Sequence, residues 1–464
     1  MANWGPTVPD DGEVPRIRAT LSVNVDGWSK QVPGSFLGIS HEWVAAEELA
    51  DPDTLQLLKD LAAYGTGALV MRIGGGSTDL QRTVPGPRVW AALRKLHQET
   101  GAVFILGINF LAEDFQLTQR QMQAIRRELP NDAVLAIELG NEPNFYPKKR
   151  NKDTADYLAC CYVNDWNGWA VPLSCPAGSA SCWTQQFAGP AWGHVHMSPE
   201  TLDWFLRVNI RWVSMATVHW YKDRAETFNT AKSLLDEAKM RRDATSLAKL
   251  VETAGKYQKA LRVAEMNTIS NNGLRGVSDT MSGALWALDA AFEVAATGAT
   301  GVNFHWGSGQ NVYSAVILRT QDGKPPIMAL STGSRLLLDS PLIYTAGQRG
   351  SVKAWPLVRT SDGSLRTVII NKHATDSARL AVSINRGSLG GGKLLRLRAP
   401  GGLFASGGVQ IARVSYGWES TETVGTPAGE RLRGKIDAAG NTVFDVRMPP
   451  GSAALLIVAP KNNA

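Results

Sequence analysis

Short apolar runs alternate with longer stretches of helical periodicity between residues 34 and 338. The runs are nearly continuous in apolar character, which is typical of parallel strands that are covered on both faces. The stretches between them have the three-to-four-residue spacing of amphipathic helices. We predict eight strand cores, at Ser35–Ile39, Ala68–Ile73, Val103–Ile108, Val134–Leu139, Thr184–Ala188, Met215–His219, Leu261–Glu265 and Gly301–His305.

Strands and helices alternate along this region, and such alternation implies right-handed parallel crossovers. Eight such units that close on themselves form a (β/α)8 TIM barrel. An open, doubly wound sheet is the alternative that the pattern leaves. The predicted helices are Pro52–Tyr64, Leu117–Glu128, Thr154–Trp166, Pro199–Val208, Ala225–Leu261 (broken in two) and Asp279–Ala296.

After Pro341 the helical periodicity stops, and short strands recur between turn signals. This pattern of short strands and turns is typical of an antiparallel β-sandwich. Arg16–Val25 alternates like a strand, and we expect it to join the C-terminal sandwich. The predicted domains are therefore a catalytic barrel at 34–338 and a sandwich built from 1–33 plus 339–464. The predicted C-terminal strands are Val352–Val358, Leu365–Ile370, Arg379–Ile384, Leu394–Leu397, Thr442–Val446 and Ala453–Val458.

The composition agrees with a large folded protein, since 44% of the 464 residues are hydrophobic and 19% are charged. A disordered or fibrous chain is thereby excluded. No stretch approaches 18 uninterrupted apolar residues, so we expect no membrane-spanning helix. The net charge of +6 is too small to indicate nucleic acid as a partner, but it is compatible with an anionic substrate. The oligomeric state is left open.

The N-terminal residues and the cysteines bear on the compartment without deciding it. Met1–Pro6 lacks the basic start and apolar run of a secretory leader, so we expect an intracellular protein or one whose leader has been removed. The four cysteines lie at positions 160, 161, 175 and 182. Cys175 and Cys182 bracket a Pro/Gly/Ser loop and can close a small disulfide ring; free thiols in a reducing compartment are the equal alternative.

Two carboxylates stand where a TIM barrel builds its active site, at the carboxyl ends of the strands. Glu142 follows the fourth strand in Leu139–Pro143, and Glu265 ends the seventh in Val263–Asn267. These strands lie across the barrel mouth from each other, so the two side chains can converge. Carboxyl groups about 5–5.5 Å apart perform retaining glycoside hydrolysis, one as acid and the other as nucleophile. Like-charge repulsion raises the pKa of one member and suits it to act as the acid.

Four blocks of the barrel resemble glycoside hydrolase family 79, which contains exo-β-glucuronidases and heparanases. An Asn-Glu-Pro acid on strand four with a Glu on strand seven is shared more widely among retaining glycosidases, whereas the four blocks together are specific. The resemblance runs in order from Ser35 to about Tyr313. The blocks are Arg72–Asp79, Glu138–Asn144, Glu265–Asn267 and Gly276–Thr280, the last followed by Ala284–Trp286.

The resemblance implies a role for five residues of this chain. Glu142 would be the general acid/base, and Glu265 the nucleophile that forms a glycosyl-enzyme intermediate. Asn141 would bind the sugar 2-hydroxyl. Tyr221 would lie beside the nucleophile, where its hydroxyl can orient the carboxylate and lower its pKa. Glu42 would bind distal sugar hydroxyls and close the non-reducing end of the pocket. Asp79 is expected to brace its loop rather than contact substrate.

Recognition of a uronate carboxylate is expected after the eighth strand, where the family uses a tyrosine hydroxyl and backbone N–H groups. Tyr313 is the candidate hydroxyl, and Gly309 is a weak substitute for the family's glycine, because Asn311 and Val312 occupy the space before the tyrosine. Gly76 stands where the family usually has Asn or Thr, which removes one possible sugar contact. These departures point to an altered subsite or a different uronic acid.

The predicted activity is exo-hydrolysis of a terminal β-linked glucuronic acid from a glucuronide or glycan, without cofactor or metal. Gly74–Gly76 lacks the Lys-Ser/Thr of a phosphate loop, and His194 and His196 are expected to be unmetallated. Lys148–Lys152 can attract a polyanion at the leaving-group side or be a solvated turn. The alternatives are heparanase-like endo-cleavage, hydrolysis of a neutral β-glycoside, and a carbohydrate-binding protein without catalysis.

Overall fold

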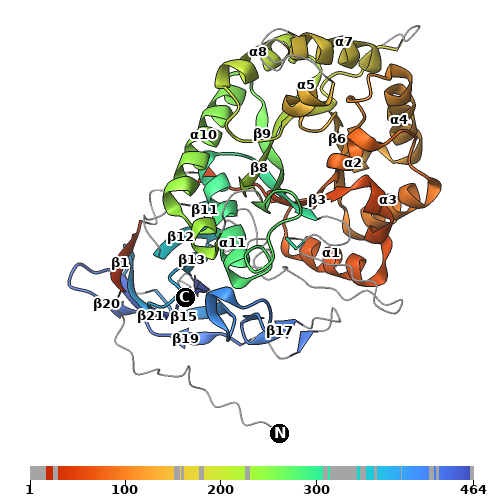
Figure 1. Ribbon diagram of the computed structural model, residues 1–464. Helices are drawn as coiled ribbons and strands as arrows, with labels where there is room; N and C mark the ends of the chain where they lie inside the picture. The colour runs from red at the N-terminus through yellow and green to blue at the C-terminus, as the bar shows by residue number, and fades with distance from the viewer. Residues whose placement is uncertain are drawn as a thin grey trace.

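A closed eight-stranded parallel barrel and a β-sandwich make up the protein, and the predicted fold is confirmed (Figure 1). The barrel order is β10-β3-β4-β5-β6-β7-β8-β9, which closes the sheet between the first and last predicted strands. The computed structural model describes residues 17–24, 30–150, 157, 161–176, 182–224, 230–306, 312–313, 342–344, 352–359, 363–387, 389–416, 423–424 and 428–459.

The barrel strands agree with the predicted cores, with one shift. The fifth strand begins at Phe187 and runs through Gly189-Pro190, a pair that the sequence rules treat as a strand end, so the prediction at Thr184–Ala188 was placed too early. The strands are β3 (Leu37–Glu42), β4 (Val70–Gly74), β5 (Val103–Ile108), β6 (Val134–Leu139), β7 (Phe187–Trp192), β8 (Val213–Asp223), β9 (Ala260–Ile269) and β10 (Gly301–Trp306).

The helices surround the barrel, and their predictions succeed to different degrees. Pro52–Tyr64 is correct to the residue, and the long predicted helix at 225–261 is broken in two. The helix at Pro87–Thr100 was missed, although Pro87 at its start and left-handed Gly101 after its end are helix signals. The described α-helices are α1 (Pro52–Tyr64), α2 (Gly76–Leu80), α3 (Pro87–Thr100), α4 (Phe115–Glu128), α5 (Tyr146–Lys149), α7 (Tyr162–Ser174), α8 (Pro199–Asn209), α9 (Ala231–Leu234), α10 (Glu237–Lys256) and α11 (Met281–Thr297).

The predicted helix at Thr154–Trp166 falls partly outside the described residues, and α7 continues through Pro172 to Ser174. None of the described helices combines the length and apolar character that crossing a bilayer requires. The described 3₁₀ segments are η1 (Trp43–Ala50), which follows β3, η2 (Asn131–Ala133), which precedes β6, η3 (Pro143–Phe145), which follows β6, and, in the sandwich, η5 (Gly402–Phe404).

Two sheets form the sandwich, and the predicted N-terminal strand joins the smaller one. This strand, β1, pairs in parallel with β14, because an edge strand from a distant segment is free of the hairpin geometry that makes neighbours antiparallel. The smaller sheet is β1 (Ile17–Val23), β14 (Ala378–Ile384), β21 (Thr442–Met448) and β20 (Lys435–Ile436).

The larger sheet packs against the smaller one through an apolar core that includes Leu21, Val382 and Phe444. The domain boundary predicted at 338 lies outside the described residues and stays a prediction. The larger sheet runs β18 (Thr423–Val424), β17 (Val414–Tyr416), β16 (Gln410–Ile411), β15 (Gly392–Arg398), β22 (Ser452–Val458), β13 (Leu365–Asn371), β12 (Val352–Arg359), β11 (Leu342–Tyr344) and β2 (Lys30–Gln31), with β19 (Glu430–Leu432) on β15.

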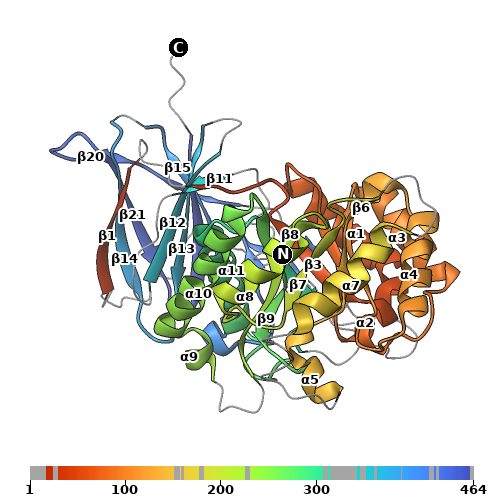
Figure 2. The same ribbon diagram turned by 90° about the horizontal axis from the view of Figure 1, so that it is seen from above.

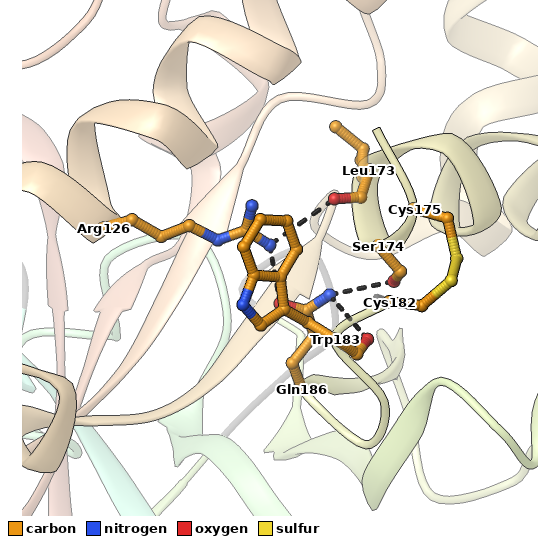
Figure 3. Close-up of a disulfide and its surroundings, with 7 residues drawn as sticks. All are labelled: Arg126, Leu173, Ser174, Cys175, Cys182, Trp183 and Gln186. Carbon is orange, nitrogen blue, oxygen red and sulfur yellow. Dashed lines mark hydrogen bonds between the residues drawn. A yellow bond between two sulfur atoms is a disulfide. The ribbon is translucent and has the colours of Figure 1, made fainter. Parts of the chain in front are cut away.

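A disulfide joins Cys175, just past α7, to Cys182 (Figure 3). Beside it, the guanidinium of Arg126 lies 3.7 Å from the centre of the Trp183 ring and donates to Gln186 Oε1 at 2.8 Å. Gln186 in turn donates to Ser174 Oγ at 2.8 Å. The disulfide and this hydrogen-bonded group together fix the segment before β7 to the ends of α4 and α7.

A buried group of charges joins the sandwich to the barrel. β12 and β13 lie along α11 and α10 in both views (Figure 2). Lys353 of β12 contacts Asp289 of α11 at 2.9 Å and Glu237 of α10 at 3.0 Å, and it also binds Glu293. Lys372 binds the same Asp289 and Glu237. Burial would raise the pKa of Asp289, but Lys372 and Lys353 hold it below its ordinary value.

We expect Lys353→Met to lower the free energy of unfolding by about 3–5 kcal/mol, since it leaves the buried Glu293 without its cation and leaves Asp289 and Glu237 with Lys372 alone. Denaturant unfolding followed by fluorescence measures this loss. Arg379→Met is the matched control, because Arg379 pairs with Asp445 on the surface of the same sandwich, where solvent screening leaves an ion pair little effect on stability. Equal losses in the two variants would contradict the assignment.

Candidate active site

Polar side chains from six barrel strands converge at the carboxyl end of the barrel. Successive side chains of a strand point to opposite faces, so residues two apart point the same way. Barrel strands thus contribute inward pairs such as His219 with Tyr221 and Glu265 with Asn267. The convergent set is Ser40 and Glu42 of β3, Arg72 of β4, Glu138 of β6 with Asn141 and Glu142 just after it, His219 and Tyr221 of β8, Glu265 and Asn267 of β9, and His305 of β10.

Arg72 lies at the centre of this set, with no exposed surface. Its Nε donates to Glu138 Oε2 at 2.8 Å, its Nη2 donates to Asn141 Oδ1 at 2.8 Å, and its Nη1 donates to Glu265 Oε2. Burial opposes the charge, but Glu138 and Glu265 outweigh it and raise the pKa of Arg72 above its ordinary value. The planar fork of the guanidinium therefore fixes three side chains, two from the end of β6 and one from β9.

Glu265 is held in its ionised form. Its Oε1 accepts a hydrogen bond from Tyr221 at 2.7 Å, and its Oε2 lies 3.9 Å from both His219 Nδ1 and His305 Nδ1. Burial alone would raise the pKa of Glu265, but His305, His219 and Arg72, together with the Tyr221 hydroxyl, lower it well below its ordinary value. A buried carboxylate that stays charged and faces a pocket can act as a nucleophile.

Glu142 lies on a tight turn after β6. Its backbone has φ 52°, and Gly140, two residues earlier, has φ 84°. Gly140 has no room for a side chain, because a Cβ there would lie 2.5 Å from Tyr146 Oη. The Glu142 amide donates to Ala191 O of β7 at 3.0 Å, and one carboxylate oxygen lies 3.0 Å from His219 Nδ1. The turn thus aims the carboxyl group at the barrel mouth, where 23% of the side chain is exposed.

One carboxylate oxygen of Glu142, one of Glu265 and one ring nitrogen of His219 lie within 4.8 Å of one another. This separation of the two carboxyl groups suits direct attack by one on a bound sugar, whereas inverting enzymes leave about 6.5–9.5 Å for a water. The same three side chains offer the ligand set of a metal site, although His219 Nδ1 already lies against Glu142. Arg72 beside Glu265 adds a positive charge that disfavours a cation there.

Asn141 is positioned by contacts on both its backbone and its side chain. Its amide N–H donates to Tyr146 Oη at 2.9 Å and to Asp79 Oδ1 at 3.3 Å, and the Tyr146 hydroxyl also donates to Asp79 at 2.6 Å. Lys149 Nζ lies 3.0 Å from the other Asp79 oxygen. Asp79 therefore braces the turn from α2, in agreement with its expected role. Burial raises the pKa of Asp79 in spite of Lys149.

Glu42 lies at the rim of the site, but its carboxylate already accepts several donors. Backbone N–H groups of Gly76 and Ser77 donate to it at 3.1 and 2.8 Å, and His305 Nε2 lies 3.3 Å away. Gly75, at φ 69°, allows this approach, since a Cβ there would lie 2.2 Å from Glu42 Oε1. Burial opposes ionisation, but His305 and the Ser77 amide lower the pKa of Glu42. Its expected contact with sugar hydroxyls remains a proposal.

Tyr313 lies in the site beside the residues of β8 and β10. Its ring centre is 6.0 Å from that of Tyr221 and 6.1 Å from that of His305, and its backbone carbonyl accepts from Asn267 Nδ2 at 3.1 Å. Burial and the nearby Glu265 raise the pKa of its hydroxyl, which therefore stays a donor. Gly309, the other predicted uronate contact, lies outside the described residues.

Four titratable residues of the site were not predicted from the sequence: Arg72, Glu138, His219 and His305. The first three had a signal in the sequence. Arg72 and Glu138 are charges inside nearly apolar strands, and a charge in such a place needs a partner of opposite sign. His219 precedes Tyr221 by two residues and so points the same way. Burial lowers the pKa of His305, but Glu265 and Glu42 raise it by more, so that His305 favours its charged form.

Solved structures share this fold at low sequence identity. No protein-family profile matches the chain, and neither does any curated protein sequence. The fold is found in several glycoside hydrolases, including the GH51 arabinofuranosidase and the GH39 enzyme from Xanthomonas axonopodis pv. citri. The arabinofuranosidase is 15% identical, with a TM-score of 0.65, and the alignment covers 96% of this chain and 100% of the arabinofuranosidase chain. The GH39 enzyme is 14% identical, with a TM-score of 0.60, and the alignment covers 98% of this chain and 99% of the GH39 chain.

A further match is the 4-O-α-L-rhamnosyl-β-D-glucuronidase from Fusarium oxysporum 12S, solved as a Rha-GlcA complex. It is 19% identical to this chain, with a TM-score of 0.76. The alignment covers 94% of this chain and 100% of the glucuronidase chain. At these identities the comparisons establish the fold, a barrel with an accessory sandwich that is shared with glycoside hydrolases. Family 79 itself is not named among them.

We expect Arg72→Met to lower the free energy of unfolding at neutral pH by about 3–5 kcal/mol, because Glu138 is left as a buried charge without its cation. The double variant Arg72→Met/Glu138→Gln removes both charges and should recover a large part of the loss. Thermal unfolding of the wild type, of Arg72→Met, of Glu138→Gln and of the double variant completes the cycle. Additive losses would contradict a direct Arg72–Glu138 interaction.

Proposed function

We propose that this protein is a retaining glycoside hydrolase that removes a terminal β-linked glucuronic acid. The observation that carries the proposal is the close approach of the Glu142 and Glu265 carboxylates, within 4.8 Å, at the carboxyl end of a TIM barrel. A carbohydrate-binding protein has no need for two converging carboxylates of which one is held ionised by four neighbours. The fold shared with glycoside hydrolases supports the same conclusion.

In the first step Glu265 attacks the anomeric carbon, and the bond from that carbon to the glycosidic oxygen breaks. Glu142 donates its proton to the departing oxygen, so the leaving group departs as a neutral alcohol. The depressed pKa of Glu265 keeps the attacking oxygen charged. A covalent glucuronyl ester on Glu265 results, with the configuration at the anomeric carbon inverted once.

In the second step Glu142, now a carboxylate, takes a proton from water, and the resulting oxygen attacks the same carbon. The ester bond to Glu265 breaks, and the second inversion restores the β configuration. Asn141 contributes in both steps through the sugar 2-hydroxyl. Because Arg72 holds the Asn141 carbonyl oxygen at 2.8 Å, the amide NH₂ is directed away from Arg72 and is suited to bind that hydroxyl.

Two observations support a uronic acid as the sugar that is released. Tyr313 presents a protonated hydroxyl in the site, and a glucuronidase is among the structures that share the fold. Exo-action is preferred over endo-cleavage of a polyanion, because Lys149 and Arg150 of the basic run are engaged within the protein, Lys149 with Asp79 and Arg150 with Glu113. A neutral β-glycoside is the alternative substrate, and a substrate comparison separates the two.

Wild-type enzyme should hydrolyse 4-nitrophenyl β-glucuronide in preference to the β-glucoside and β-xyloside, without loss in the presence of a chelator. We expect Glu265→Ala to lower kcat by at least about 10⁴-fold and Glu142→Ala by about 10²–10⁴-fold. Azide should restore both, giving the α-azide with Glu265→Ala and the β-azide with Glu142→Ala, because each variant opens a different face of the sugar. Interchanged azide configurations would reverse the two assignments, and an absence of glucuronide cleavage would remove the uronate claim.

Tyr221→Phe removes a donor from the ionised form of Glu265 and should raise the pKa of that carboxyl group. Since the nucleophile must be ionised, the acid limb of kcat/KM should move to higher pH. We expect kcat/KM to fall about tenfold at the acid end of the profile and less near neutrality. Tyr257→Phe, a change at a tyrosine remote from the site, should leave the profile unaltered. An unchanged acid limb in Tyr221→Phe would show that the hydroxyl does not stabilise the carboxylate.

A further inference from the structure

Phe145 exposes an aromatic ring beside the carboxyl group of Glu142. It ends η3, three residues after Glu142, and its amide donates to Glu142 O at 2.9 Å. Despite its size, 39% of the residue is exposed, whereas the neighbouring Asn144 and Tyr146 are buried. No step of the proposed mechanism uses this ring.

The loop after β7 shows how close the ring and the carboxyl group lie. A Cβ added to Gly193 would lie 2.7 Å from Phe145 Cε2 and 3.0 Å from Glu142 Cδ, so both groups border the same small space. The Gly193 amide donates to Asn144 Oδ1 at 2.8 Å, which fixes this loop to the η3 turn. Glycine at position 193 therefore leaves room for Phe145 and Glu142 to lie side by side.

The exposed fractions rank these groups by how deeply they are buried. The side chain of Glu265 is 8% exposed and that of Glu142 is 23% exposed, while Phe145 is 39% exposed. The order runs from the floor of the site to its mouth. Since the acid must reach the glycosidic oxygen, the group beyond that oxygen lies on the outer side of Glu142, which is the side of Phe145.

We propose that Phe145 is the leaving-group platform, which stacks on a flat apolar face carried by the aglycone. An aryl ring and the CH face of a second sugar share this chemistry. Lys149 is held by Asp79 at 3.0 Å, so the platform is aromatic and apolar rather than an anion site. The inference rests on the proposed hydrolysis and on Glu142 as its acid, and it adds the nature of the group that is released.

Phe145→Ala tests the platform with two substrates that differ only in the leaving group. On 4-nitrophenyl β-glucuronide we expect kcat/KM to fall about tenfold. On β-glucuronyl fluoride, whose leaving group has no face to stack, kcat and kcat/KM should change less than about twofold. Phe145→Trp should retain the rate on the aryl substrate. A glucuronyl disaccharide, assayed in parallel, distinguishes the two kinds of leaving group. If Phe145→Ala also lowers kcat/KM on the disaccharide, the ring stacks on a sugar face. If only the aryl substrate is affected, the ring stacks on an aryl aglycone.

Phe404→Ala is the matched control, because Phe404 is 62% exposed on the sandwich and should affect neither substrate. Equal losses on both substrates would overturn the proposal, since hydrolysis of the fluoride needs Glu142 as base and would report a disturbed turn. An unchanged rate on the aryl substrate and the disaccharide would overturn it as well. If the wild type cleaves no glucuronide, the uronate proposal fails but the platform proposal can still be tested. The 4-nitrophenyl glycoside and the glycosyl fluoride are then prepared from the glucose or xylose derivative that the enzyme does cleave.

Discussion

The buried guanidinium of Arg72 is the interaction on which the site depends. It is fully buried at the carboxyl end of the barrel and reaches Glu138 and Asn141 at 2.8 Å as well as Glu265. A buried cation is costly unless it is surrounded by carboxylates and hydrogen-bond acceptors, and the barrel supplies these from β6 and β9. The charge is therefore a structural requirement of the barrel interior, and after His305 and His219 it is the third charge that keeps Glu265 ionised. The same guanidinium thus contributes both to the packing of the barrel and to the charge state of Glu265.

The sandwich supports the strands that carry this chemistry. α10 follows β8, which carries Tyr221, and α11 follows β9, which carries Glu265. Lys353 and Lys372 of the sandwich neutralise acids on these two helices, and the Trp355 indole donates to Asp289 at 3.1 Å. The accessory domain thus packs behind the hydrogen-bonded Tyr221–Glu265 pair and restrains the two helices that follow their strands.

The sequence predicted the fold because apolar periodicity is a local property, and eight strand cores with intervening helices leave few topologies. The prediction misplaced β7, because Gly189-Pro190 lies inside that strand. It correctly assigned the N-terminal strand to the sandwich but did not specify its partner, because β14 belongs to a distant segment. Of the candidate site, the two glutamates could be found because strand ends meet at one edge of a barrel. The role of Arg72 could not, because its partners Ser40, Glu138 and Glu265 lie on three separate strands, which the closed sheet brings together.

The two glutamates differ in how deeply they are buried and in the charged groups that surround them. Glu265 lies next to Arg72 and two histidines and accepts from Tyr221, so its ionised form is favoured despite burial. Glu142 lies higher, on a turn whose φ of 52° turns its carboxyl group toward the mouth, with His219 as its polar neighbour. In the proposed mechanism Glu142 exchanges protons in each cycle and benefits from access to solvent, whereas Glu265 attacks the sugar and benefits from exclusion of solvent. The positions of the two residues, one on a loop and the other on a strand, suit these two proposed roles.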